Sequence, residues 1–405
     1  MRYVPVLLII ILLVSCPAPA RGDEFRVVPS LSVREEYNSN ILLTTGDARR
    51  DFITTISPGV EIVDRTARLD ADLQVRLDRL EYADNRDLNA TNQTYSGRIR
   101  YLLTPLFGVS AEAAYMRLPN PSLVTVSTGV VTTASPWDRA TSSLSADYRF
   151  TEKTAALFSY TFGRDHFENA TSSDNTSHDL NAGIEYDLGE YVPAMKGRAN
   201  IGYGHYSFTD SRTQKITGTV GLSRKIDEVW SVSVDGGVIR ARSTVSVSQP
   251  VPIVVGQEIV GYYLVPGQES NAGWGWVGKA SLDYSGESMN GSLGYTRDLR
   301  PASGYNGAAE SNALTLSAQY RLTYELSVLL TSGYYTLKSD PSQFSSQIIN
   351  QKTFIVSPAV RYEFSRDVAL ESSYEYIKID YPASNTSASR QVIAVRLSVQ
   401  HPFFE

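Results

Sequence analysis

The sequence predicts an all-β fold, a transmembrane antiparallel up-and-down β-barrel that crosses the membrane with its strands. Three observations lead to this fold class. Apolar and polar residues alternate over many short segments, short turns alternate with long connections, and aromatic residues gather just before the short turns. A period of two places alternate side chains on opposite faces of a strand. A wall of such strands can face lipid on one side and water on the other.

The alternation is clearest in segments 67–78, 273–284 and 313–322. In 313–322, every second residue is Leu, Ala or Tyr, and the residues between them are Thr, Ser, Gln and Arg. No stretch after residue 25 is long and apolar enough to form a transmembrane helix. Strands are therefore the elements predicted to cross the membrane.

The connections distinguish a membrane barrel from a soluble β-sandwich, which would show the same alternation. Tight turns are expected at 151–153, 323–325 and 365–367, and long polar connections at 117–138, 244–272, 301–312 and 338–351. Short periplasmic turns and long extracellular loops are typical of outer-membrane barrels. The residues expected to form an aromatic girdle at the short-turn side are Tyr148, Phe150, Tyr320, Tyr362 and Phe364.

About eighteen strands are predicted, an even number that brings both ends of the chain to the short-turn side. Barrels of about 16–18 strands leave a water-filled channel, whereas eight-stranded barrels are filled by their own side chains. The predicted strands are 26–37, 51–64, 67–82, 92–103, 107–116, 139–150, 154–166, 177–188, 196–208, 214–225, 229–243, 273–284, 289–300, 313–322, 326–337, 352–364, 367–379 and 390–400.

Residues 1–22 are interpreted as a signal peptide, and residues 23–405 as the barrel. Arg2 precedes the apolar run Val6–Val14, which is too short to cross a bilayer as a helix. This pattern predicts export and an integral location in the outer membrane of a Gram-negative bacterium.

The residues after the apolar run leave two ways of processing the leader open. Small residues allow simple cleavage after Ala20 or Gly22. The segment Leu13–Cys16 is also similar to a lipobox, which would make Cys16 a lipidated N-terminus. Because the chain has 1 Cys, simple cleavage would leave a mature protein without thiol chemistry or disulfides.

Composition argues against nucleic-acid binding and against catalysis. The net charge is -6 and no block of Lys or Arg occurs, so nucleic acid is not expected as a partner. None of the 4 His has metal-ligand spacing to another His or to Cys. His178–Asp179 could be half of a hydrolytic site, but a nucleophile, a base and an orienting residue cannot be assigned together. The prediction is a protein that is not an enzyme and needs no cofactor.

If the apolar set faces lipid, the alternate set lines the lumen. Both charge signs occur in it, whereas a strongly ion-selective pore is expected to concentrate one sign in rings. Alternatively, many of these residues form charge pairs between neighbouring strands and have no role beyond keeping the lumen hydrated. The candidate lumen-lining residues are Arg68, Asp70, Asp72, Arg76, Asp78, Arg98, Arg100, Asp147, Arg149, Glu185, Asp187, Lys279, Asp283, Arg321, Arg361, Glu363, Glu371 and Arg396.

Two loop segments, 122–135 and 250–267, are unusually rich in β-branched and apolar residues. Each is typical of a small hairpin. They are expected either to extend hairpins above the membrane or to fold inward and gate the pore.

The first two predicted strands resemble a family of β-barrel porins associated with exopolysaccharide export. The similarity rests on Pro29–Val33, Glu36–Ile41 and Asp51–Gly59, some thirty residues in all. It implies a barrel of around eighteen strands and a role in polymer export, without assigning a role to any residue. The chain ends in Phe403-Phe404-Glu405, so the terminal aromatic signal that the barrel-assembly machinery reads is shifted from the last position.

Together these features predict a porin-like, passive outer-membrane channel that exports a polysaccharide. Expected partners are outer-membrane lipid, the barrel-assembly machinery and periplasmic components of polysaccharide export. One alternative is a general diffusion porin for small solutes. Another is a barrel without a transport role, which displays its loops at the surface or holds a periplasmic partner.

Overall fold

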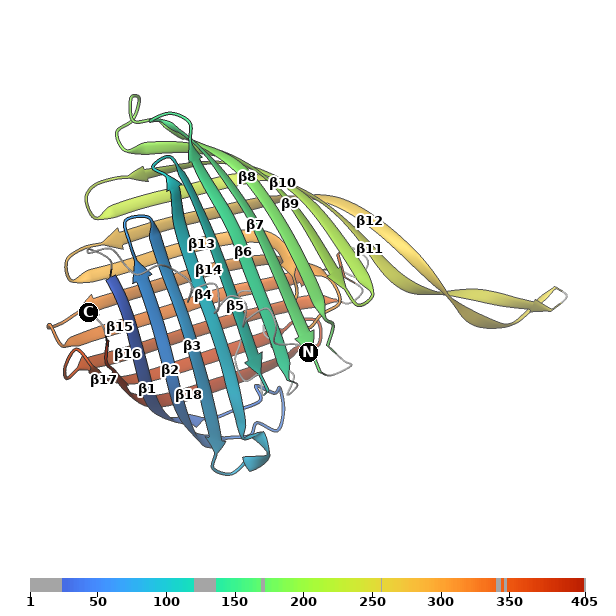
Figure 1. Ribbon diagram of the computed structural model, residues 1–405. Coiled ribbons are helices and arrows are strands. Elements are labelled where there is room, and N and C mark those ends of the chain that lie inside the picture. Colours follow the sequence, from blue (N-terminus) through green and yellow to red (C-terminus); the bar gives the residue numbers. More distant parts are fainter. Residues whose placement is uncertain are drawn as a thin grey trace.

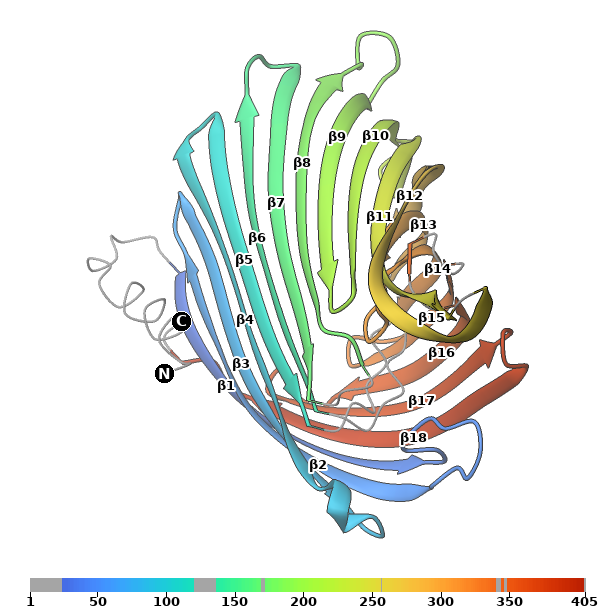
Figure 2. The same ribbon diagram turned by 90° about the vertical axis from the view of Figure 1, so that its right-hand side faces the viewer.

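The computed structural model describes residues 24–119, 136–168, 172–255, 257–339, 344–345 and 348–403. These residues contain an antiparallel sheet of 18 strands, in which each strand pairs with its neighbours in the chain. β1 also pairs with β18, from Ser30 opposite Gln400 to Asn38 opposite Val392. The sheet therefore closes into a barrel (Figure 1; Figure 2), and the predicted fold class is confirmed.

The strands have the following bounds, with one 3-10 helix, η1 (Arg86–Leu88), between β3 and β4. The first nine are β1 (Glu24–Asn38), β2 (Asp51–Arg65), β3 (Leu69–Tyr82), β4 (Ala90–Thr104), β5 (Phe107–Leu118), β6 (Trp137–Arg149), β7 (Thr154–Phe167), β8 (Asn175–Asp187) and β9 (Met195–Phe208). The last nine are β10 (Ser211–Lys225), β11 (Trp230–Val255), β12 (Glu258–Ser285), β13 (Met289–Pro301), β14 (Ala308–Arg321), β15 (Leu326–Ser339), β16 (Ile349–Glu363), β17 (Val368–Tyr381) and β18 (Thr386–Gln400). Among the described residues, no helix is long and apolar enough to cross a membrane.

One pair of strands departs from the predicted lengths. The expected long connection 244–272 is strand, because β11 and β12 stay paired from Trp230 opposite Tyr284 to Val255 opposite Glu258. Their outer half leaves the wall as a two-stranded arm that projects far beyond the barrel (Figure 1). Segment 250–267 is thus an extended hairpin and does not fold inward. Segment 122–135 lies outside the described residues.

The three predicted short turns share one hydrogen-bonding arrangement. A hydroxyl at the first turn position accepts two backbone N–H groups: Thr151 Oγ1 from residues 153 and 154, and Thr323 Oγ1 from residues 325 and 326. Ser365 Oγ likewise accepts hydrogen bonds from the backbone N–H groups of residues 367 and 368. Ser and Thr favour turns because their side chains satisfy nearby backbone donors. We call this side of the barrel the turn end, and the opposite side the loop end.

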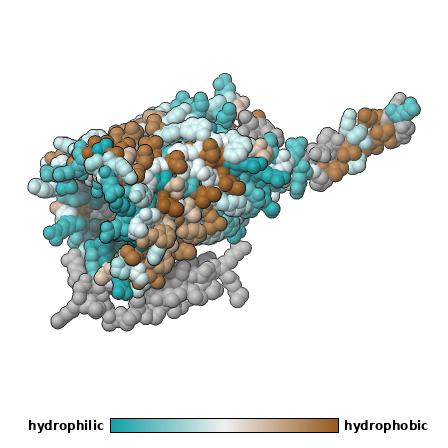
Figure 3. Space-filling model, turned by 90° about the horizontal axis from the view of Figure 1, so that it is seen from above, coloured by the Kyte–Doolittle hydropathy of each residue, from teal (hydrophilic) through white to brown (hydrophobic). Residues whose placement is uncertain are grey.

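The outer face of the barrel is an apolar belt. On β18, Ile393 is 56% exposed and Val395 is 45% exposed, whereas the alternate residues Val392 and Ala394 are buried. Directly paired residues share a face, so the strand register extends this alternation around the barrel. Figure 3 shows the apolar belt between hydrophilic ends. At its turn end the belt carries the five predicted girdle aromatics, all exposed.

The apolar core lies inside the loop end of the barrel. Leu118, Trp137 and Phe167 form one cluster there, with parallel stacking of the Trp137 and Phe167 rings at 6.1 Å. Ile41 and Leu43, from the β1–β2 connection, bring further apolar side chains into this half. The loop end is therefore narrowed by side chains and connections, while the rest of the lumen keeps a polar lining.

Candidate functional site

The register places the predicted lumen residues on the inner wall, with one exception. Arg68 lies in the exposed turn between β2 and β3 and not on a strand. The other candidates occupy strand positions that alternate with the apolar belt, as Asp72 opposite Arg98 and Arg361 opposite Glu371 illustrate. Several form ion pairs along the wall, including Arg100 with Asp147 at 3.1 Å.

The β13–β14 connection, residues 302–307, lies across the loop end of the lumen. On one side Ser303 donates a hydrogen bond of 3.1 Å to Asp165 of β7, and Asn306 accepts one from Ser211 of β10. On the other side Tyr305 packs beside a cluster that includes Leu337 of β15. These contacts join widely separated strands, so the connection narrows the channel.

Three residues of this lumen-crossing loop are almost inaccessible: Ala302 is 0%, Ser303 2% and Asn306 5% exposed. Burial, with a smaller contribution from Tyr381, raises the pKa of Tyr305 to about 12. Its phenol therefore stays neutral across the physiological range. The loop is held by packing and hydrogen bonds and has no ionised side chain of its own.

Gly307 is needed to seat the lumen-crossing loop. Its φ is +151°, and a Cβ atom there would overlap the backbone of Phe344 and Ser345. Gly307→Ala should therefore displace the loop and lower the free energy of unfolding by about 1–3 kcal/mol. Urea unfolding in lipid vesicles would measure the loss, and an equally stable variant with unchanged conductance would contradict it.

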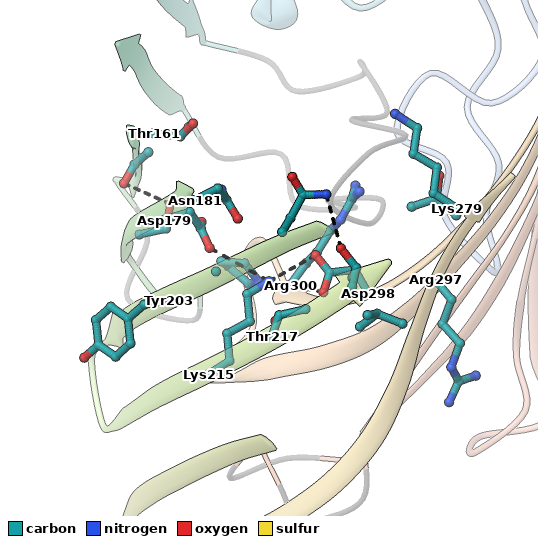
Figure 4. Close-up of a pocket in the computed structure, with 18 of the residues that line it drawn as sticks. Thr161, Asp179, Asn181, Tyr203, Lys215, Thr217, Lys279, Arg297, Asp298 and Arg300 are labelled. Atoms are coloured by element: carbon teal, nitrogen blue, oxygen red, sulfur yellow. Dashed lines mark hydrogen bonds and ion pairs between the residues drawn. The ribbon is translucent and has the colours of Figure 1, made fainter. Parts of the chain in front are cut away.

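Beside this loop, the inner wall formed by β6 to β13 encloses a cavity of about 770 Å³. Its lining consists mainly of Asn, Thr, Ser and charged side chains. Figure 4 shows Asp179, Lys215 and Asp298 converging on one wall of this cavity, with Lys279 on the other side. We call this space the lumen pocket.

Lys215 is the centre of the ion network in the lumen pocket. Its Nζ lies 3.1 and 3.0 Å from the two carboxylate oxygens of Asp298, 2.9 Å from the carbonyl oxygen of Leu299 and 3.8 Å from Asp179. Tyr206 donates a hydrogen bond of 2.9 Å to Asp179, and its ring centroid lies 5.4 Å from Nζ. Lys215 is only 8% exposed, so its charge is satisfied by these partners.

A second ion pair crosses a glycine. Arg198 on β9 donates hydrogen bonds of 2.6 and 2.7 Å to the carboxylate of Asp235 on β11. Gly221 of β10 lies between them in the register, opposite both residues. A Cβ atom at Gly221 would overlap the Asp235 carboxylate, so the absence of a side chain lets the two residues meet.

Gly221→Val should separate this pair without changing any charge. We expect the conductance to reach half of its high-salt value at a higher salt concentration. We also expect the free energy of unfolding to fall by about 1–2 kcal/mol, because charge-assisted hydrogen bonds are lost. Single-channel recording at several salt concentrations would test this, with Gly218→Val as the control, because no atom lies within 4 Å of a Cβ at Gly218. Equal behaviour of the two variants would refute the spacer role.

Positive and negative groups alternate in the lumen pocket, and several of them compensate each other. Lys215 and Arg198 are paired as described, and Arg139 lies 3.7 Å from Asp165. Lys279 is exposed and forms no ion pair with the described residues. The pocket therefore offers many hydrogen-bond donors and acceptors, and its lining contains more Lys and Arg than Asp.

Most of the lumen pocket's charged residues were not among the sequence candidates. Lys279 was predicted, whereas Asp179, Lys215 and Asp298 were not. Each of the missed residues alternates with the apolar belt on its own strand, so extending the period-two rule to every strand would have found them. Their convergence needed the register of strands that are far apart in sequence.

Within the described part of the chain, the histidines do not form the hydrolytic site that the sequence left open. His178 faces the outer wall, where its Nδ1 lies 2.8 Å from the hydroxyl of Tyr160, while Asp179 faces the lumen. Neighbouring residues on opposite faces of a strand cannot act together, so the His178–Asp179 alternative was wrong. Among the described residues, no group of three or more His, Cys, Asp and Glu could hold a metal ion.

No protein-family model matches this chain, and no curated protein matches it. Solved structures that it resembles include OccK3 (OpdO) of Pseudomonas aeruginosa, at 12% identity over 94% of this chain and 96% of that one, with a TM-score of 0.45. Another is OccAB4 of Acinetobacter baumannii, at 11% identity over 95% and 100%, with a TM-score of 0.46. A third is OccK2 (OpdF) of Pseudomonas aeruginosa in complex with glucuronate, at 10% identity over 94% and 98%, with a TM-score of 0.42.

Proposed function

We propose that this chain is a passive outer-membrane channel for small polar solutes. The observation that carries the proposal is the polar inner wall of a closed 18-stranded barrel, which opens into the lumen pocket of about 770 Å³. Barrels of this size hold water in the lumen. β1 begins and β18 ends at the turn end, which faces the periplasm in this proposal. The barrel-assembly machinery inserts the chain into the membrane.

The lumen-crossing loop favours small solutes over a polymer. Residues 302–307 bridge β7 and β10 on one side and the β15 region on the other. A polysaccharide chain would need a lumen that is open along its whole length. The similarity in the first two strands led us to expect export of a polysaccharide. We propose passage of small solutes in its place.

The paired charges favour neutral hydroxylated or zwitterionic solutes. The cations Lys215 and Arg198 each hold an acidic partner within 3.0 Å. A field of one sign would select anions or cations, whereas adjacent donors and acceptors hydrogen-bond to solutes of either kind. We expect a modest preference for anions over cations, because more Lys and Arg than Asp line the pocket, and a ranking of neutral solutes that is set by size.

Planar-bilayer recording with purified protein tests the channel directly. We expect stable single-channel steps and, in liposome-swelling assays, faster entry of monosaccharides than of trisaccharides. A protein that inserts and gives no conductance, even with residues 302–307 shortened, would refute the channel. A protein that admits long oligosaccharides as fast as monosaccharides would restore the polymer-conduit hypothesis.

A further inference from the structure

At the loop end, the apolar belt on the outer wall gives way to charged residues. On β10 the outward-facing cations Arg212 and Arg224 are twelve residues apart and bracket exposed apolar residues such as Ile216 and Val220. Twelve residues of a strand tilted by about 45° rise roughly 28 Å, close to the apolar height of an outer-membrane barrel. Arg212 therefore lies at the level where lipid headgroups begin.

Three outward arginines lie at this level or just below it on β10 and β11, with Arg240 the lowest because it is opposite Ile216. Arg240 and Arg242 are alternate residues of β11, so they point to the same side. Arg242 pairs with Gln214, and Arg212 pairs with Thr244, which makes Arg212 and Arg242 diagonal neighbours. Diagonal side chains on one face lie about 7–8 Å apart. All three arginines are exposed.

This arginine cluster has no acidic counterpart among the described residues. Three other cations of the outer wall at the loop end have acidic partners within the protein. Arg79 pairs with Glu81 at 2.6 Å, and Lys378 pairs with Asp380 at 3.1 Å. Arg297 is held in the same way by Glu310 at 2.6 Å. Like charges at neighbouring positions of a sheet destabilise it unless an anion is present. The cluster is therefore complementary to an external anion.

The surroundings of the cluster also suit a lipid headgroup. The Arg240 guanidinium lies 5.6 Å from the ring centroid of Trp274, which is 72% exposed. Trp is typical of membrane interfaces, and a stacked Arg keeps its N–H groups in a fixed plane. Arg242 Nε donates a hydrogen bond of 3.0 Å to Ser270, and hydroxyl and amide side chains of Thr244 and Gln214 share this face. Phosphate and sugar groups could both find partners here.

We propose that Arg212, Arg240 and Arg242 form a binding site for the phosphate groups of an anionic glycolipid in the outer leaflet. The site rests on the proposed outer-membrane location but not on transport. Bidentate arginine contacts bind phosphate through two parallel hydrogen bonds. Basic residues at a membrane surface also attract anionic lipid through their net charge. The bound lipid compensates the repulsion among the three guanidinium groups.

The test is binding of bisphosphorylated lipid A to purified, folded protein in detergent micelles, measured by fluorescence titration. The triple variant R212A/R240A/R242A should bind about 100-fold more weakly than the wild type. The matched control R68A/R224A/R366A removes the same charge from exposed residues of the turn end and should bind like the wild type. Fully dephosphorylated lipid A should bind the wild type as weakly as lipid A binds the triple variant.

Equal affinity of the triple variant and the wild type would overturn the proposal. If inorganic phosphate displaces lipid A from the arginine cluster at an equal concentration, the ligand is a free phosphate and not a lipid. A triple Arg→Lys variant keeps the charge but loses the bidentate geometry, so its affinity for lipid A should lie between those of the wild type and the triple Ala variant. This variant also shows that weak binding of the Ala variant is not caused by misfolding. Conductance of the triple variant should be unchanged, which separates this site from the channel function.

Discussion

Replacing residues 303–306 by two glycines should raise the single-channel conductance about twofold or more and admit larger solutes. The lumen-crossing loop is held by hydrogen bonds from Ser303 to Asp165 and from Ser211 to Asn306, so it stays across the loop end of the lumen. The conductance of a wide barrel is set by its narrowest part. Planar-bilayer recording and liposome swelling with sugars of increasing size would measure both effects.

The arm of β11 and β12 provides the control for this deletion. Joining residue 246 to residue 268 through two glycines removes a longer hairpin that lies outside the lumen (Figure 1). Conductance should then match the wild type. If the arm deletion raises conductance as much as the loop deletion does, or if neither changes it, the obstruction by residues 302–307 is disproved.

Lys215→Met should have the largest effect on stability among single substitutions in the lumen pocket. It leaves the carboxylates of Asp298 and Asp179 next to each other without their shared cation. Removing one partner of a buried ion pair costs about 3 kcal/mol. The remaining negative charge should also shift the reversal potential in a salt gradient toward cation selectivity. Urea unfolding in vesicles and reversal potentials would measure the two effects.

Two further variants separate the network from a general effect of charge. The double variant Lys215→Met with Asp298→Asn removes a cation and an anion together, and it should recover about half or more of the lost stability. Lys225→Met removes a cation from an exposed position at the turn end of the same strand and should leave stability near that of the wild type. A Lys215→Met protein as stable as Lys225→Met would exclude the proposed network.

The strands and their faces could be predicted because each is encoded locally. In 313–322, for example, the period of two assigns Leu314 and Leu316 to the outer face, and both are exposed there. The turns at Thr151, Thr323 and Ser365 could be located for the same reason, since a hydroxyl satisfies the backbone of its own turn. These features depend on neighbours two to four residues away.

The length of β11 and β12 could not be predicted from the same rule. Segment 244–272 contains Pro and Gly and is polar in part, which is typical of a loop. The structure keeps it paired as an arm because the two strands continue in register from the barrel wall. Strand pairing outside the membrane does not require one apolar face, so the alternation signal is absent there.

The sequence by itself determined a closed barrel with a polar lumen. Amphipathic strands in a membrane must pair all their backbone groups, so they close into a barrel with their polar faces inward. Only the tertiary structure decided where the channel narrows and which charges meet. Lys215 and Asp298 are 83 residues apart and come together across β10 to β13. The lumen-crossing loop is likewise seated by β7, β10 and β15, which are distant in the chain. Contacts of this kind depend on how the barrel closes, and no local pattern of residues encodes them.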